Sequence, residues 1–147
     1  MIVMKHVLSA QTALSLVQHA FAHAQAQGWP VAVAVTDPDG EMLAALRMDG
    51  VGPHILGFAS DKAYTAALMR VTTKAYFEEV SQRDDSRIVL ANRQRFIVWG
   101  GGLPVVHDGR VVGGIGVSGA TAAEDIECAQ AALTAEGLDW AVPAQAG

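Results

Sequence analysis

Residues 101–125, GGLPVVHDGRVVGGIGVSGATAAED, carry the strongest local signals for the fold. Asp108 and Gly109 at its centre predict the two-residue turn of a β-hairpin, because both central residues of such a turn need a positive φ. The apolar runs on either side, 104–107 and 111–117, are the expected arms of that hairpin. The stretch therefore indicates neighbouring antiparallel strands rather than a parallel strand followed by a crossover.

Three glycines of this stretch, Gly114, Gly116 and Gly119, have the G-x-G-x-x-G spacing of a dinucleotide-binding loop. Such a loop belongs to a parallel β-α-β unit, and here the preceding strand is the second arm of a hairpin. Only residues 138–147 follow the last expected helix, too few for the missing strands. We interpret Gly113 and Gly114 as positions where another element packs closely, and Gly116 and Gly119 as the passage from strand to helix.

The other elements follow from periodicity and turn residues. Leu14, Val17, Phe21 and Ala24 recur at helical spacing and predict an amphipathic helix. In chain order the prediction is a helix over 10–27, strands 31–36 and 41–48 around the turn 37–40, helices 53–70 and 72–80, an irregular polar segment 81–95, a strand 96–99 (FIVW), the hairpin, and a helix from the capping box Thr121–Glu124 to Gly137.

The element order α-β-β-α-α-β-β-β-α predicts an α+β fold, because hairpins make an antiparallel sheet with helices laid against it. We expect a single domain over residues 1–147, with a central sheet of about five strands. Of these residues 51% are hydrophobic and only 17% are charged, which suggests that apolar surface is buried between subunits.

Charge and hydropathy exclude several classes of function. The formal net charge is −5 and no Lys/Arg cluster offsets it, so a nucleic-acid partner is not expected. No apolar run of the length needed for a membrane span is present, and polar residues interrupt any signal-peptide core before Gly28. The expected location is the cytoplasm.

Neither the single cysteine nor the paired histidines indicate a disulfide or a metal site. Cys128 is the single cysteine, which excludes an intramolecular disulfide and a cysteine-built zinc site, and it is expected as a small buried thiol. His19 and His23 have the spacing of a paired metal site on a helix, but no third ligand is evident. We expect no metal site.

Lys62 is the most informative single residue. On a helical wheel of 53–70 it falls inside the apolar arc that includes Ile55, Phe58 and Ala59. A lysine there extends to solvent, forms an ion pair (Asp125 or Glu124 being the candidates) or contacts a ligand. A desolvated lysine also has a lowered pKa and can act as a base or bind a carboxylate.

Further candidates lie in loops and turns. His54, at the start of the same helix, is either an exposed histidine or an acid/base group or haem ligand. Arg47 and Asp49 lie at the end of a hairpin strand. They form either an ion pair on the surface or the entrance to a site that orients a small acidic ligand. Ser118 lies in a tight turn but lacks the G-x-S-x-G pattern, so a serine hydrolase is rejected.

Three segments in combination resemble the GlcG/HbpS family, also described as haem-binding or PduO C-terminal-like. They are VAVAVTDPDGEMLAALRMDG (31–50), GFASDKAYTAA (57–67) and GGLPVVHDGRVVGGIGVSGATAAEDIECAQAAL (101–133), and the resemblance runs from about residue 8 to residue 136. It implies a profilin- or PAS-like domain with a central antiparallel sheet that assembles into tetramers or octamers. It also implies haem as a possible cofactor, and a gene context of catabolic enzymes.

Residues of this chain match the family motifs at definite positions. Matched residues are Lys62 and Tyr64 in the helix motif, Asp49 and Gly50 in M-D-G, and Gly101, Gly102, Gly116, Ser118, Gly119 and Asp125 in the glycine hairpin. None is an evident haem ligand, so we expect the axial ligand of a haem to be His54 or, as the second choice, another histidine at a contact between subunits.

Two functions follow as expectations. The first is an oligomeric cytoplasmic protein that binds haem or a small molecule between helix 53–70, the loop before it and the glycine hairpin, with Arg47, Asp49, His54, Lys62, Gly101, Gly102 and Ser118 as ligand-binding residues. The alternative is a small enzyme of isomerase, lyase or hydrolase type acting on a small organic acid in a catabolic pathway. In that case Lys62 or His54 would transfer protons and Arg47 would hold the carboxylate.

Overall fold

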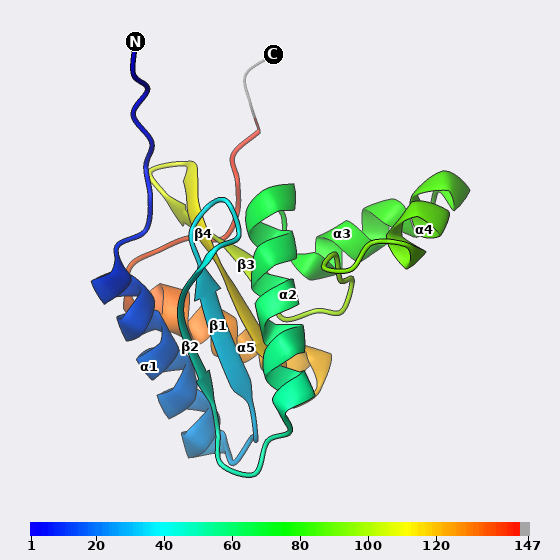
Figure 1. The fold of residues 1–147 in the computed structure, drawn as a ribbon. Coiled ribbons are helices and arrows are strands. Elements are labelled where there is room, and N and C mark those ends of the chain that lie inside the picture. The colour runs from blue at the N-terminus through cyan, green and yellow to red at the C-terminus, as the bar shows by residue number, and fades with distance from the viewer. Residues whose placement is uncertain (145–147) are drawn as a thin grey trace.

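A computed structural model describes residues 1–144 and shows an antiparallel sheet of four strands, in the order β2-β1-β4-β3, with helices on both faces (Figure 1). The elements are α1 (Ala10–Gln27), β1 (Ala32–Thr36), β2 (Met42–Arg47), α2 (Pro53–Met69), α3 (Thr73–Val80), α4 (Asp84–Ala91), β3 (Gly102–His107), β4 (Arg110–Ser118) and α5 (Ala122–Ala135). The α+β class and both hairpins are confirmed.

Antiparallel pairing runs through the whole sheet. β1 pairs with β2 on one side and with β4 on the other, where Ala32 lies opposite Ser118 and Ala34 opposite Gly116. The β3–β4 turn has φ of +48° at Asp108 and +74° at Gly109, as the sequence predicted. Because β4 has no parallel neighbour, the G-x-G-x-x-G glycines do not form a dinucleotide loop.

Helices α1 and α5 cover one face of the sheet, and the larger apolar core lies between them and the strands (Figure 1). Its largest fully buried side chains include Leu16, Leu103, Ile115 and Leu133, with the Cys128 thiol beside them. The buried face of α1 passes through Ala13, Leu16, Val17, Ala20 and Ala24. The prediction was wrong for Leu14, which is 45% exposed and lies outside the buried face of the helix.

Helix α2 covers the opposite face and lies unusually close to the strands. A Cβ atom built on Gly114 would stand 2.3 Å from the carbonyl oxygen of Ala63, and one on Gly116 would stand 2.0 Å from that of Ala59. Alanines of the helix thus rest directly on glycines of β4. The close approach at Gly114 is as expected, whereas Gly116, which we had placed at the passage from strand to helix, has the same packing role.

Two local predictions for residues 81–99 are wrong. Residues 96–99 do not form a fifth strand, because the Ile97 N–H donates to the Thr65 hydroxyl (3.0 Å) on α2 instead of joining the edge strand β3. Residues 84–91, expected to be irregular, form α4, whose first turn carries Asp84 and Asp85 where carboxylates stabilise a helix. The observed order is therefore α-β-β-α-α-α-β-β-α.

The capping box at the start of α5 gives a first prediction. The Thr121 hydroxyl accepts from the Glu124 N–H (3.2 Å), and the Glu124 carboxylate accepts from the Thr121 N–H (3.2 Å). Thr121→Ala removes one acceptor and is expected to lower the free energy of unfolding by about 1 kcal/mol in urea titrations. Thr121→Ser keeps the acceptor and should be close to wild type; an equal loss in both variants would contradict the capping role.

Candidate functional site

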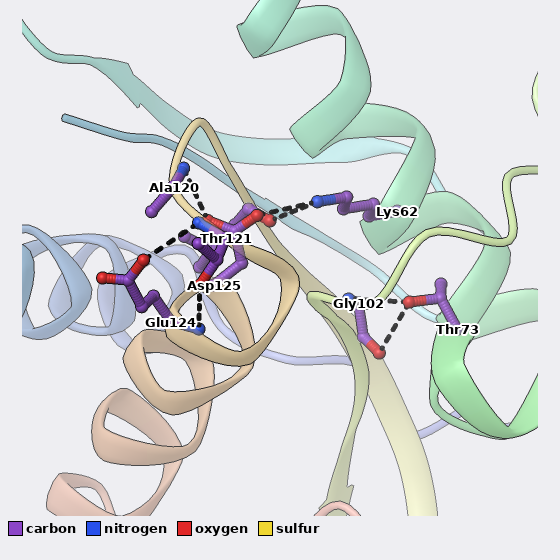
Figure 2. A network of polar contacts seen from close by, with 8 residues as sticks. Lys62, Thr73, Gly102, Ala120, Thr121, Glu124 and Asp125 are labelled. Carbon is purple, nitrogen blue, oxygen red and sulfur yellow. Dashed lines mark hydrogen bonds and ion pairs between the residues drawn. The ribbon is translucent and has the colours of Figure 1, made fainter. Parts of the chain in front are cut away.

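The side chain of Lys62 lies between α2 and the loop that follows β4. It is 2% exposed and projects toward α5 (Figure 2). Its Nζ donates to the carbonyl oxygen of Val117 (2.9 Å) and to Oδ2 of Asp125 (3.1 Å). Of the two ion-pair partners that the sequence offered, the structure selects Asp125, while Glu124 caps the helix.

Two glycines make room for this lysine. Gly101 has a φ of +125°, and a Cβ atom there would meet the Val117 carbonyl oxygen at 2.4 Å and the Lys62 Nζ at 3.0 Å. A Cβ atom on Gly102 would stand 2.4 Å from the Lys62 carbonyl oxygen. Gly102 also exchanges hydrogen bonds with the Thr73 hydroxyl, which joins β3 to α3 (Figure 2). Both predicted site glycines therefore position the lysine.

Asp125 holds the other end of the pair from the first turn of α5. It is 2% exposed, and its Oδ1 accepts the backbone N–H of Ala120 (3.1 Å). The two carboxylate oxygens thus have separate partners, one cationic and one backbone (Figure 2). This geometry fixes the carboxylate relative to the lysine.

Burial shifts both groups toward their neutral forms. It lowers the pKa of Lys62, and the nearby Asp125 carboxylate opposes this only in part. Burial likewise raises the pKa of Asp125 against the effects of Lys62 and the Ala120 N–H. Because the two pKa values move toward each other, passing a proton between these groups costs less than it does in water.

A polar cavity of about 250 Å³ adjoins the pair. Its lining comes from α2, from residues 99–100 and from the start of α5: Ile55, Phe58, Lys62, Trp99, Gly100, Ser118, Gly119, Ala120, Ala122 and Asp125. Ser118, which is 4% exposed, contributes to this lining. The cavity therefore combines an amine, a carboxylate and a hydroxyl behind an aromatic wall.

A larger apolar cavity of about 430 Å³ lies on the other side of that wall. Its lining is Phe58, Phe77, Val80, Ser81, Arg87, Leu90, Ala91, Phe96, Ile97, Val98 and Trp99. Phe58 and Trp99 line both cavities and meet edge to face, with ring centroids 5.2 Å apart. Trp99 is 57% exposed, so the shared wall opens to solvent.

His54 lies beside this wall but outside the lining of both cavities. Its exposed ring packs edge-on against Phe58 at 5.8 Å between centroids and lies over Gly52. The structure thus brings His54 near Lys62 only through Phe58. Its predicted role as acid/base group or axial ligand stays a prediction.

Arg47 and Asp49 do not line either cavity. The Arg47 guanidinium donates to the carbonyl oxygen of Val51 (2.5 Å), and Asp49 is exposed. The two do not form an ion pair with each other in the described part of the chain. Arg47 instead steadies the loop that leads into α2.

The remaining histidines of α1 have carboxylate partners on α5. His19 contacts Glu136 (3.1 Å) and His23 contacts Glu127 (2.8 Å). Within residues 1–144 no three His, Cys, Asp or Glu side chains gather closely enough to hold a metal ion. In the same range no helix combines the length and apolar character needed to cross a membrane.

Sequence reasoning missed the aromatic wall. Phe58 was assigned to the apolar arc of α2 and Trp99 to a strand, so neither was named as a site residue. The available signal was Gly100–Gly102, which ends any strand at Trp99 and leaves its side chain free to turn toward α2.

Comparison with known proteins places this geometry in a family. The model of a family described as "Haem degrading protein HbpS-like" matches residues 8–134. The protein GlcG of Escherichia coli K12 is 39% identical over 114 residues, which cover 78% of this chain and 83% of GlcG.

Solved structures agree with the sequence comparison. A double mutant of HbpS from Streptomyces reticuli superposes with a TM-score of 0.83 at 30% identity, covering 91% of this chain and 90% of that one. A PduOC:heme complex superposes with a TM-score of 0.82 at 26% identity, covering 91% and 98%.

Proposed function

This chain belongs to the HbpS-like family, and on that premise we propose that it is an oligomeric binding protein for haem or another flat, largely apolar small molecule. One observation carries the proposal: two adjoining cavities share an aromatic wall that is open to solvent. Ligand sites are typically concave and mostly apolar, with a few polar groups that fix orientation. The apolar cavity supplies the first property and the Lys62–Asp125 cavity the second.

The residues of the apolar cavity fit a haem. Phe58, Phe77, Phe96 and Trp99 offer ring faces and edges to a flat macrocycle, and Arg87 in the lining offers a cation to a propionate. His54, whose imidazole packs against Phe58 of the wall, would be the residue that holds the iron. When bound, haem would supply a redox-active iron; the chain's own part is to bind and orient it.

The test is a visible absorption titration of the purified protein with haemin, for wild type and His54→Ala. We expect a saturable Soret shift with one haem per subunit, and at least a tenfold weaker affinity in His54→Ala because the axial ligand is lost. His107→Ala, at the exposed tip of the β3–β4 hairpin, is the matched control and should bind as wild type does. Non-saturating binding that is indifferent to position 54 would contradict haem as the ligand.

Self-association is the second half of the proposal, and the expected form is a tetramer or octamer. Large apolar side chains are exposed on and around the arm formed by α3 and α4, which projects from the body of the molecule (Figure 1). They include Phe77, Ile88, Val89 and Trp99. Apolar area of this kind is usually buried between subunits. Size-exclusion chromatography of the apo-protein and of the haem-loaded protein measures the subunit number.

A second candidate function is an enzyme that acts on a small organic acid, of isomerase, lyase or hydrolase type. The observation that favours it is the buried Lys62–Asp125 pair, which lines the polar cavity together with Ser118. Groups whose pKa values are moved toward each other are suited to proton transfer. In this function Lys62 holds or moves the proton, and Lys62→Ala abolishes turnover of the acid.

A further inference from the structure

The hydrogen bonds of Lys62 leave one position on its nitrogen open. An ammonium has three N–H donors, and the described residues offer two acceptors, the Val117 carbonyl and the Asp125 carboxylate. A neutral amine has two N–H donors, which those acceptors satisfy, and a lone pair at the remaining position. The site therefore accommodates the neutral amine without an orphaned donor.

The surroundings suit a reacting carbonyl group. Lys62 lines the polar cavity together with Ser118, whose hydroxyl can donate to an incoming oxygen. The Asp125 carboxylate, 3.1 Å from Nζ, is placed to exchange protons with the amine and with the departing oxygen. Burial lowers the pKa of Lys62, which increases the fraction of nucleophilic amine at neutral pH.

The lining also selects among carbonyl compounds. Ile55, Phe58, Trp99, Ala120 and Ala122 give an apolar wall, and among the described residues of the lining Asp125 is the one anion. A carboxylate directly attached to the carbonyl, as in a 2-oxo acid, would be brought against Asp125 and repelled. A short neutral aldehyde avoids this repulsion, and a volume of about 250 Å³ holds only a small one.

We propose that Lys62 forms a reversible imine with small neutral aldehydes in the polar cavity, a covalent capture activity that goes beyond the proposed haem binding and takes a neutral substrate in place of the acid of the second candidate function. The amine nitrogen bonds to the carbonyl carbon, and one of its protons passes to the carbonyl oxygen, through Asp125, to give a carbinolamine. Asp125 then takes the second N–H proton and delivers it to the hydroxyl, which leaves as water while the C=N bond forms. No oxidant or reductant is consumed.

The test traps the imine. Wild-type protein is incubated with butanal and cyanoborohydride, which reduces an imine to a stable secondary amine, and the modified lysines are located by peptide mass mapping. The sequence has three lysines, Lys5, Lys62 and Lys74, so the exposed Lys74 serves as an internal control. We expect Lys62 to be modified at least tenfold faster than Lys74 and with saturation in butanal, whereas pyruvate at the same concentration labels it far less.

Two variants test the separate roles of the Lys62 amine and the Asp125 carboxylate. Lys62→Arg keeps a cation but has no primary amine, and it should lose the saturable label. Asp125→Asn should retain the label at Lys62 but form it at least tenfold more slowly, since the proton carrier is gone. Equal modification of Lys62 and Lys74, or an unmodified Lys62 in the wild type, overturns the proposal even if both variants fail to fold. The haemin titration is read at position 54 and the imine at Lys62, so failure of the proposed haem binding and failure of the imine are distinguishable.

Discussion

Replacing Gly116 with alanine is expected to destabilise the fold by about 3 kcal/mol or more, near or beyond the upper end of ordinary overpacking. The added methyl group would stand 2.0 Å from the carbonyl oxygen of Ala59 and 2.7 Å from the amide nitrogen of Ala63. Both atoms belong to the backbone of α2, so no side-chain rotation relieves the overlap. The helix itself must move away from β4. Urea unfolding followed by far-ultraviolet circular dichroism measures the loss.

The matched control is Gly57→Ala on the same helix. Gly57 is exposed in the interior of α2, and a Cβ atom there meets nothing within 4 Å. Alanine at this position should stabilise the protein by about 0.5–1 kcal/mol through the ordinary helix preference. A Gly116→Ala variant as stable as wild type would mean that α2 does not rest on the glycines of β4.

Lifting α2 would also displace the site. Lys62 follows Ala59 by less than one turn, and its backbone carbonyl faces Gly102, the cross-strand partner of Gly116. Any movement of α2 away from the sheet withdraws Nζ from Val117 and Asp125. The glycines that resemble a nucleotide loop in the sequence therefore set the depth at which the lysine enters the cavity.

Local signals explain why most of the fold could be predicted. The Asp108–Gly109 turn and the Thr121–Glu124 capping box are each complete within a few residues, and both appear in the structure. The segment 96–99 failed because its β-forming residues are held by Thr65, about thirty residues earlier, which no local pattern records. Contacts with distant segments, not propensity, decided its conformation.

The candidate site, like the fold, could be predicted only where the signal is local in the sequence. The position of Lys62 followed from the helical period of α2, and Asp125 was one of two carboxylates that could pair with it. The sequence placed a site between helix 53–70, the loop before it and the glycine hairpin, and the polar cavity is lined by that helix and by the end of that hairpin, but not by the loop. The apolar cavity was not predicted, because its lining comes from α2, α3, α4 and residues 96–99, which only the tertiary fold brings together. Trp99 lines both cavities from a loop that the Ile97–Thr65 hydrogen bond ties to α2.

Replacing Asp125 with alanine is the second change expected to have a large effect, a loss of about 3–5 kcal/mol in the free energy of unfolding at neutral pH. The substitution leaves the buried Lys62 ammonium without its counter-ion and the Ala120 N–H without its acceptor. A buried charge that loses its partner retains its full desolvation cost. Thermal and urea unfolding at fixed pH measure the difference from wild type.

The destabilisation caused by Asp125→Ala is expected to decrease as the pH rises. Asp125 normally raises the pKa of Lys62 against the effect of burial, so its removal lowers that pKa further. At pH values below 10.5, the ordinary pKa of a lysine, Lys62 of the folded variant then binds fewer protons than Lys62 of the unfolded chain. The free energy of unfolding of the variant therefore increases with pH. The gap between wild type and Asp125→Ala should therefore narrow from about pH 7 to about pH 9.

Two further variants show that the effect belongs to the buried pair. Lys62→Met combined with Asp125→Leu removes both charges and should cost less than Asp125→Ala alone, because no unpaired ion remains. Asp39→Ala breaks the exposed ion pair with Lys5 and should change stability by no more than about 0.5 kcal/mol. If Asp125→Ala proves as mild as Asp39→Ala, or its cost does not vary with pH, then Lys62 is not held as a desolvated cation by Asp125. The proton exchange between Lys62 and Asp125, on which both the proton-transfer function and the imine step depend, would then lose its physical basis.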